Sequence, residues 1–216
     1  MASEERNALR LASGWTKESR IFEEAKACYE ETFPEHERVD FGRMLEFSLL
    51  NRETTSLDLW QAGGQFAGLD YWSRLPGDEE RFYVAYLAVA PAFRSRGLGS
   101  EILRRTVAKN PSAVWLLDIE KPDPGLPDLS LRLRRFGFYR RNGWHDTGMC
   151  TSVEDGSFQL LSTRERVAPG THEVVSFKFW GRLMAFAEGH PEMTDEEIMK
   201  SGTGTRFWTD KIRTQG

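Results

Sequence analysis

The feature of this sequence best suited to chemistry is a basic, glycine-containing turn between an apolar strand and a helix. Arg94, Arg96, Gly97 and Gly99 stand between the apolar run 84–90 and an amphipathic stretch. Backbone N–H groups at the start of a helix lack partners and the helix dipole is positive there, so anions bind them readily. The glycines let a ligand approach the backbone, and the arginines can reach phosphate oxygens. The turn therefore predicts a binding site for a diphosphate.

The spacing within this turn narrows the kind of diphosphate site. A dinucleotide fingerprint needs a third glycine where this chain has Ile102, and a P-loop needs a lysine after its last glycine, which Gly99 lacks. The remaining pattern is Arg94-x-x-Gly97-x-Gly99, preceded by LAVAP at residues 87–91. It resembles the acyl-CoA loop of the GNAT superfamily of N-acetyltransferases, in which Arg/Gln-x-x-Gly-x-Gly/Ala follows a strand ending in Leu-x-Val-x-Pro. The alternative interpretation is an ordinary strand-loop-helix connection.

A second stretch further along the chain supports the resemblance. Residues 135–144 read RFGFYRRNGW and are similar to the Phe-Tyr-x-x-x-Gly-Phe signature of the family, with Trp144 in the last aromatic place. Alone, such a segment indicates a helix end with core packing. The resemblance covers residues 9–163. We therefore expect an acetyltransferase domain over residues 1–163, with residues 164–216 as a helical extension packed on the same domain.

The resemblance implies an α/β fold of mixed type. Its central sheet is mixed but mostly antiparallel, is flanked by helices, and contains one parallel pair of strands that splay apart. Hydrophobic periodicity places strands and helices in the order that this fold needs. The pattern predicts strands over residues 7–13, 57–60, 66–72, 81–90, 113–119, 147–153 and 158–161, and helices over residues 17–33, 40–50, 98–109, 129–142 and 171–188. The first half of 171–188 could also be a strand, and residues 194–197 resemble the capping box of one more helix.

The resemblance also implies which residues contact acetyl-CoA, the expected acyl donor. The pantetheine arm is expected along the strand before the turn, and the diphosphate on the turn itself. The candidate cofactor-binding residues are Leu87, Ala88, Val89, Arg94, Ser95, Arg96, Gly97, Leu98, Gly99, Ser100, Arg132 and Tyr139. Arg132 departs from the pattern, because family members often carry an asparagine at that place.

The implied reaction is attack by an amine on the thioester carbonyl. It needs a base for the amine, a donor for the oxyanion and a proton for the thiolate. By the family pattern, Tyr139 protonates the thiolate and the backbone N–H of Val89 stabilises the oxyanion. No acidic residue lies within 82–90, whereas Asp118 and Glu120 end the next strand. Glu120 is the candidate catalytic base, because it borders the expected splay.

The acceptor side carries acidic residues. Glu31, Phe33 and Glu35 lie in the helix-loop-helix region that lines the acceptor pocket in this superfamily, and they are the candidate substrate-binding residues. They could be merely solvated surface, or they could form an anionic mouth that attracts a cationic amine. We therefore expect an N-acetyltransferase that acts on a primary amine of a small molecule or peptide. The alternative is a GNAT-fold module that binds acyl-CoA without turnover. A protein-modifying enzyme, or a toxin acting on charged tRNA, would need a basic acceptor surface.

Composition excludes several other classes of protein. The chain has 216 residues, 39% of them hydrophobic, and a net charge of −4, which argues against a nucleic-acid-binding surface. Its four histidines and two cysteines form no metal-ligand spacing, and Cys28 is expected in the core. Neither a secretory signal nor an apolar run long enough to span a bilayer is visible. We therefore expect a cytoplasmic protein without a metal, a nucleic acid or a membrane as partner. The apolar extension could form a homodimer contact.

Overall fold

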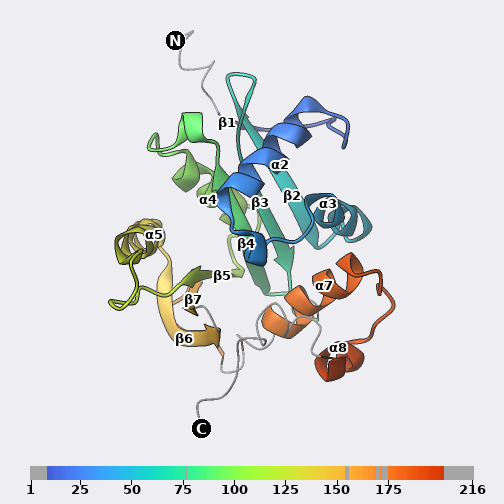
Figure 1. The fold of residues 1–216 in the computed structure, drawn as a ribbon, viewed down its shortest axis with the longest axis vertical. Coiled ribbons are helices and arrows are strands. Elements are labelled where there is room, and N and C mark those ends of the chain that lie inside the picture. The colour runs from blue at the N-terminus through green and yellow to red at the C-terminus, as the bar shows by residue number, and fades with distance from the viewer. Residues whose placement is uncertain (1–8, 76, 154–155, 169–170, 172–174, 202–216) are drawn as a thin grey trace. The chain divides into compact units, whose positions relative to one another are not determined.

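The computed structural model describes residues 9–75, 77–153, 156–168, 171 and 175–201 (Figure 1). The strands are β1 (Leu9–Leu11), β2 (Thr55–Ala62), β3 (Gln65–Arg74), β4 (Arg81–Val89), β5 (Val114–Glu120), β6 (His145–Val153) and β7 (Gly156–Ser162). The helices are α2 (Arg20–Thr32), α3 (Phe41–Leu50), α4 (Leu98–Val107), α5 (Leu129–Arg141), α7 (Arg182–Ala187) and α8 (Asp195–Ser201). Short helical turns are η1 (Glu35–Glu37), η2 (Pro91–Phe93) and η3 (Val175–Gly181).

The strands form one seven-stranded sheet in the order β1-β2-β3-β4-β5-β7-β6. Pairs β1/β2, β5/β7 and β6/β7 are antiparallel, whereas β4 and β5 are parallel. The parallel pairing aligns Arg81–Tyr83 with Val114–Leu116. A mixed sheet with one parallel pair, flanked by helices, confirms the expected fold class.

Contacts along the chain divide it into two units, each described by itself below. The first comprises residues 1–72 and 85–111, and the second comprises residues 73–84 and 112–216, so each holds part of β4. The domain boundary expected after residue 163 comes from the extent of the family resemblance and not from contacts, so it stays a prediction.

In the first unit, helices cover both faces of the sheet. Neighbouring residues of a strand point to opposite faces, and β3 makes this visible. A carboxyl oxygen of Asp70 lies 2.9 Å from the Thr106 hydroxyl of α4, while the Tyr71 hydroxyl donates to the Met44 carbonyl of α3 at 3.3 Å. Helices α4 and α3 therefore lie on opposite faces of β3. Gly68 allows β3, β4 and α4 to pack this closely, because a Cβ there would stand 2.6 Å from the Ala88 carbonyl oxygen.

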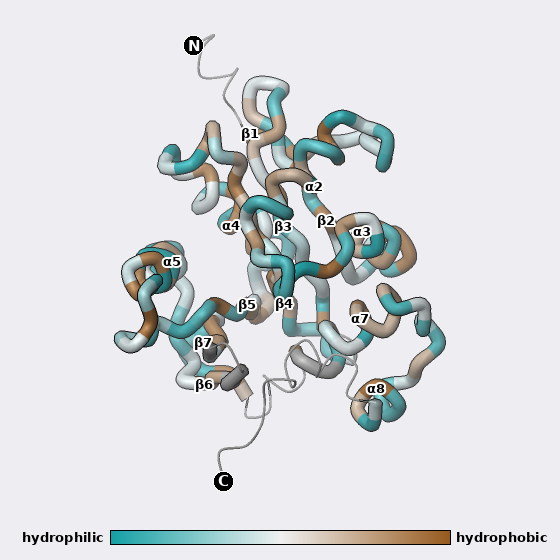
Figure 2. Tube along the Cα trace, in the orientation of Figure 1, coloured by the Kyte–Doolittle hydropathy of each residue, from teal (hydrophilic) through white to brown (hydrophobic). Residues whose placement is uncertain are grey.

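The core of the first unit follows the apolar periodicity of its helices. Helix α2 buries Phe22, Ala25, Cys28 and Tyr29, which confirms Cys28 as a core residue. Helix α3 begins at Asp40, whose carboxylate accepts from the Arg43 N–H at 2.8 Å as an N-cap. In Figure 2, α3 alternates between hydrophobic and hydrophilic segments, as expected of a helix with one buried face.

In the second unit, β5, β7 and β6 pair antiparallel and Trp115 is fully buried. Its ring stacks on Phe82 of β4 with centroids 4.8 Å apart. The capping box expected at 194–197 is confirmed, because the Thr194 N–H donates to the Glu197 carboxylate at 2.8 Å and the Glu197 N–H donates to the Thr194 hydroxyl at 3.3 Å. No described helix combines the length and hydrophobicity of a bilayer-spanning segment.

The extension departs from the prediction in its helix type. The segment Val175–Gly181 is a π-helix, and an α-helix follows only from Arg182. The alternative of a strand is therefore wrong from Val175 onward, while residues 172–174 lie outside the described residues. Phe179 and Trp180 are adjacent in sequence, and both pack their rings against Tyr83. The smaller rotation per residue of a π-helix suits two neighbouring side chains that share one contact.

Candidate active site

The loop between β4 and α4 presents unpaired backbone N–H groups. Gly97 is the N-cap residue of α4 and has φ +79°, a left-handed conformation in which a Cβ is strained. No side chain caps the helix, and the bond that closes its first turn runs from the Glu101 N–H to the Gly97 carbonyl at 3.1 Å. Within the described part of the chain, no acceptor contacts the N–H groups of Leu98, Gly99 or Ser100. This is the geometry that binds an anion at a helix start.

The side chains of the loop add exposed positive charge. Arg94, Ser95, Arg96 and Gly97 are all exposed, whereas Phe93 is buried and anchors the loop. The Arg96 guanidinium lies 5.8 Å from the centroid of the Phe93 ring, a cation–π contact that holds the Arg96 side chain near the loop. Ser95 has φ +62°, a left-handed conformation uncommon outside glycine. The loop thus has a fixed backbone and open surroundings.

Arg94 joins this loop to the expected acceptor region of the same unit. Its Nε donates to the Val89 carbonyl at 3.0 Å, and its Nη2 lies 3.5 Å from both the Thr32 hydroxyl and a Glu31 carboxylate oxygen. The structure therefore brings together Arg94, which the sequence assigned to binding of the acyl donor, and Glu31, which it assigned to binding of the amine acceptor. Both side chains are about half exposed, so the ion pair itself is weak.

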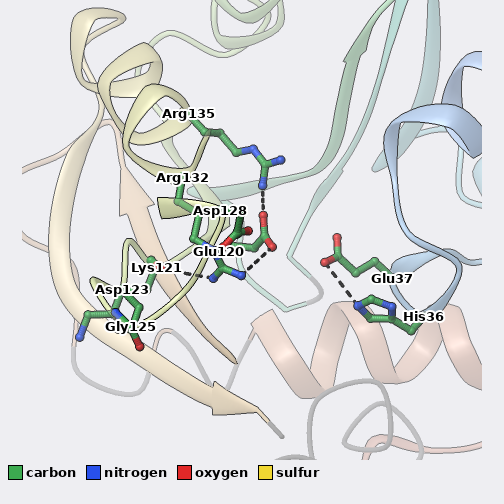
Figure 3. Close-up of polar contacts among 9 residues, drawn as sticks. All are labelled: His36, Glu37, Glu120, Lys121, Asp123, Gly125, Asp128, Arg132 and Arg135. Atoms are coloured by element: carbon green, nitrogen blue, oxygen red, sulfur yellow. Dashed lines mark hydrogen bonds and ion pairs between the residues drawn. The ribbon is translucent and has the colours of Figure 1, made fainter. Parts of the chain in front are cut away.

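The remaining acceptor candidates lie around an aromatic cluster. The Phe33 ring packs against Tyr29 and Tyr86 with centroids 5.3 and 4.9 Å away. The Tyr86 hydroxyl donates to the Glu37 carbonyl at 2.7 Å and so fixes the loop after α2. Glu35 is exposed in the turn η1. In the same turn His36 and Glu37 approach each other at 3.8 Å (Figure 3).

The edge of β4 decides which strand residues can meet a pantetheine arm. The Ala90 N–H donates to the Ala67 carbonyl of β3 at 2.9 Å. Because backbone direction alternates along a strand, Ala88 also turns its backbone groups toward β3. Leu87 and Val89 turn theirs to the other edge, and neither is among the residues that pair with β5. Leu87 and Val89 can therefore contact a pantetheine arm through their backbone groups, whereas the backbone groups of Ala88 face β3 within the sheet.

In the second unit, Glu120 is engaged by two arginines of α5 (Figure 3). One carboxylate oxygen lies 3.2 Å from Nη2 of Arg132, and the other accepts from Nη1 of Arg135. Arg132 also donates to Asp128 at 2.9 Å and to the Lys121 carbonyl at 3.3 Å, and its side chain is only 8% exposed. Arg132 thus ties α5 to β5, and its guanidinium is already satisfied without a phosphate. Both oxygens of Glu120 are occupied in the same way.

Tyr139 offers a free hydroxyl on the same helix. Its ring meets Phe138 and Trp144 edge-on at 5.0 and 6.1 Å, and its hydroxyl has no hydrogen-bond partner among the described residues. Burial raises the pKa of Tyr139 to about 12, although the charge of Arg135 opposes the shift. The hydroxyl is therefore protonated at neutral pH and available as a donor.

Sequence reasoning missed Tyr83, a buried residue that links β5 to the extension. Its hydroxyl donates to a carboxylate oxygen of Asp118 at 3.2 Å and accepts from Nε1 of Trp180 at 3.2 Å. Burial raises the pKa of Tyr83 well above its ordinary value, and the charges of Asp118 and Tyr139 act in the same direction. Tyr83, Asp118 and Tyr139 therefore lie within electrostatic range of one another. A tyrosine in an apolar strand carries no signal of this in the sequence.

Comparison with solved structures finds the same fold in several acetyltransferases. A GNAT-family protein from Bacteroides thetaiotaomicron aligns over 83% of this chain and 98% of its own, with a TM-score of 0.58 at 15% identity. One from Desulfovibrio desulfuricans aligns over 72% and 96%, with a TM-score of 0.56 at 16% identity. YncA from Salmonella typhimurium, solved with its cofactor acetyl-CoA, aligns over 76% and 98%, with a TM-score of 0.52 at 15% identity. At these identities the likeness is one of fold.

The sequence itself gives the family. A search of curated protein sequences finds no significant match. Residues 19–125 match the family model described as acetyltransferase (GNAT) family, a range that contains the whole loop 94–100 and the strand before it. Residues 19–125 of this chain are therefore a domain of the acetyltransferase (GNAT) family.

Proposed function

We propose that this protein is an N-acetyltransferase that moves an acetyl group from acetyl-CoA to a primary amine of a small molecule or peptide. The observation that carries the proposal is the uncapped start of α4 behind Gly97, where three backbone N–H groups lack acceptors in the described part of the chain. Such groups bind a diphosphate through both hydrogen bonds and the helix dipole. The acetyl-CoA in the fold relative YncA supports the same donor.

In this proposal the backbone does most of the donor binding. The N–H groups of Leu98, Gly99 and Ser100 hold the diphosphate, and the exposed Arg96 adds charge beside it. The backbone of Leu87 and Val89 pairs with the amides of the pantetheine arm, as an added strand does. The Val89 N–H also stabilises the oxyanion.

Proton transfer is assigned to side chains of the second unit. Tyr139 donates the proton that the departing thiolate needs, a role that its free hydroxyl and its pKa of about 12 support. For the base, the contacts of the two candidates differ. Glu120 has both oxygens engaged by guanidinium groups, whereas Asp118 meets the neutral hydroxyl of Tyr83. We therefore place Asp118 ahead of Glu120 as the group that takes the proton of the amine.

The acceptor is proposed to approach the end of α2. Glu31 is exposed there and paired only weakly, so a cationic amine can compete with Arg94 for its carboxylate. Phe33 presents an aromatic ring to the aliphatic part of the amine, and Glu35 adds negative charge. This assignment rests on the place of these residues in the family pattern and on their exposure.

Thermal shift with acetyl-CoA, followed by thiol release with a panel of primary amines, tests the proposal. Stabilisation by acetyl-CoA together with amine-dependent thiol release is the expected result. Stabilisation without thiol release from any amine would favour the alternative, a binding module without turnover. No stabilisation by either acetyl-CoA or CoA would overturn the donor assignment itself.

A further inference from the structure

Two buried carboxylates lie beneath α4 in the first unit. Asp70 of β3 is fully buried and Asp58 of β2 is 5% exposed. Asp58 accepts from Nζ of Lys109 at 2.6 Å, from Nε1 of Trp72 at 2.9 Å and from the Ser56 hydroxyl at 2.7 Å. A buried carboxylate with a cation and two neutral donors is well satisfied as an anion. Asp58 therefore forms an ion pair with Lys109.

Asp70 has no cation of its own among the residues that the structure describes. One carboxylate oxygen accepts from Nε1 of Trp60, and the other lies 2.9 Å from the Thr106 hydroxyl. Arg105 stands over the Trp60 ring at 6.0 Å, but its guanidinium donates to Glu101 and to the Leu9 carbonyl. An ionised Asp70 would therefore place a second negative charge beside Asp58 in the core, against one lysine.

The contacts of Thr106 favour a protonated Asp70. The Thr106 hydroxyl oxygen lies 2.9 Å from the Ile102 carbonyl and 2.9 Å from the Asp70 carboxyl oxygen. A threonine hydroxyl has one hydrogen, so with an ionised Asp70 these two acceptors would have to share it. With a protonated Asp70 each contact has a hydrogen of its own, because Asp70 donates to Thr106 and Thr106 donates to Ile102.

We propose that Asp70 is a neutral carboxylic acid in the folded protein and that in this form it is a positioning residue for α4. Its proton joins β3 to Thr106, near the carboxyl end of the helix whose other end carries the unpaired N–H groups. Loss of that proton leaves the single Thr106 hydrogen to be shared between Asp70 and the Ile102 carbonyl, and it adds a charge beside Asp58. The helix then loses its fixed position on the sheet, and with it the alignment of its first turn. The link to cofactor binding rests on the proposed function.

The electrostatics of the site agree with this assignment. Burial raises the pKa of Asp70 to about 8, and the charge of Asp58 adds to the shift, against the opposing effects of Trp60, Thr106 and Lys109. The sign for stability follows from proton binding. Between its unfolded pKa near 3.8 and its folded pKa near 8, Asp70 holds a proton only in the folded state. Its contribution to stability therefore declines as pH rises through this window.

The first test compares the wild type with Asp70→Asn, whose amide can donate to Thr106 and accept from Trp60 in the same geometry. The wild-type unfolding constant should rise about tenfold per pH unit relative to the variant between pH 5 and 7. A difference infrared spectrum, wild type minus variant, should hold a protonated carboxyl band at pH 6 that vanishes above pH 8. Parallel stability profiles and no such band would overturn the proton assignment.

The second test measures CoA affinity for the same two proteins from pH 7 to pH 9. Wild-type affinity should fall at least about fivefold more than that of Asp70→Asn, the lower range of measured couplings between sites. Equal profiles would overturn the positioning role even if the infrared band is present. If neither protein binds CoA at any pH, the proposed function fails while the infrared and stability results still decide the proton.

Asp58→Asn is the matched variant that tests how the charge of Asp58 affects the protonation of Asp70. It removes the anion beside Asp70 and leaves Lys109 without its carboxylate, so both changes favour an ionised Asp70. The infrared band of Asp70 should then disappear at a lower pH than in the wild type. An unchanged or higher midpoint would contradict the role assigned to Asp58.

Discussion

The loop 94–100 in the first unit and helix α5 in the second both resemble a family signature, but they present their chemistry in different ways. The loop presents backbone N–H groups, and its arginine and serine side chains are exposed. Helix α5 presents side chains, and its Arg132 and Arg135 are held in contacts with Glu120 and Asp128. Backbone chemistry follows from glycine spacing alone, whereas side-chain chemistry depends on partners that lie far away in the sequence.

This contrast predicts two kinds of variant. Changes in α5 and β5 should lower turnover and leave donor binding intact, while changes in the loop should weaken donor binding first.

The largest effect is expected from Tyr139→Phe. The change removes a protonated hydroxyl that has no partner among the described residues, so unfolding free energy should stay nearly constant. Without its proton donor, kcat should fall by roughly 100- to 10,000-fold. Steady-state kinetics with acetyl-CoA measure kcat and KM separately, and KM should change little.

Tyr71→Phe is the control for loss of a tyrosine hydroxyl. It removes a buried hydrogen bond to the Met44 carbonyl and should cost about 1 kcal/mol of stability without lowering kcat. A parallel loss of acetyl-CoA affinity in Tyr139→Phe would indicate that this residue is structural.

The two carboxylates of β5 provide the next comparison. Asp118→Asn should reduce kcat at neutral pH by roughly 100-fold if this group takes the proton of the amine. Glu120→Gln should instead destabilise the fold by about 1–3 kcal/mol, because Arg132 is buried and loses one of its charged partners. Denaturant unfolding and kcat, measured on both variants, separate the roles. The reverse pattern would restore Glu120 as the base.

Gly97→Ala tests the loop. A Cβ there meets no atom within 4 Å, so the protein itself has room for it and the cost comes from the left-handed backbone. That strain costs about 1–2 kcal/mol, and CoA affinity should fall by at least about tenfold, since the first turn of α4 shifts. Isothermal titration with CoA measures the loss.

Gly64→Ala matches this change elsewhere in the same unit. Gly64 has φ +77° and equally open surroundings, but it lies in the turn between β2 and β3. It should lose a similar amount of stability and bind CoA normally. If both variants bind CoA equally well, the loop is not the diphosphate site.

The smallest effect is expected from Glu101→Gln, in the first turn of α4. Arg104 and then Arg105 hold the pKa of Glu101 down to about 2. A carboxyl whose folded pKa is depressed stabilises the fold above its unfolded pKa, near 4.5, and loses that effect as pH falls toward 2. The variant should therefore lose a few tenths of a kcal/mol at pH 7 and nothing near pH 2. Thermal melts across this range measure the difference.

Much of the fold was readable from hydrophobic period and turn chemistry. The helices at α2, α3, α4 and α5 begin and end within a few residues of their predicted bounds. Helices α2, α3 and α4 each have one apolar face, and α5 ends just before Gly143. The π-helix at Val175–Gly181 was not predictable, since two of its side chains pack on Tyr83, which lies far away in the sequence. Local sequence does not report such a distant partner.

In the candidate site, too, some features follow from local sequence and others depend on distant residues. The left-handed Gly97 and the open first turn follow from the spacing of the motif. The engagement of Glu120 by Arg132 and Arg135, the hydrogen bond from Tyr83 to Asp118 and the burial of Asp70 all depend on residues that meet only in the folded chain. Charged residues met one at a time in a sequence do not reveal which of them are already paired.

The central claim is that backbone N–H groups at the start of α4 hold the diphosphate of an acyl-CoA. Amide chemical shifts, followed by two-dimensional NMR during separate titrations with CoA, ADP and pantetheine, test it most directly. The amides of Leu98, Gly99 and Ser100 should shift with CoA and with ADP, and stay in place with pantetheine. Shifts with CoA confined to other residues, or a complete absence of shifts, would contradict the account.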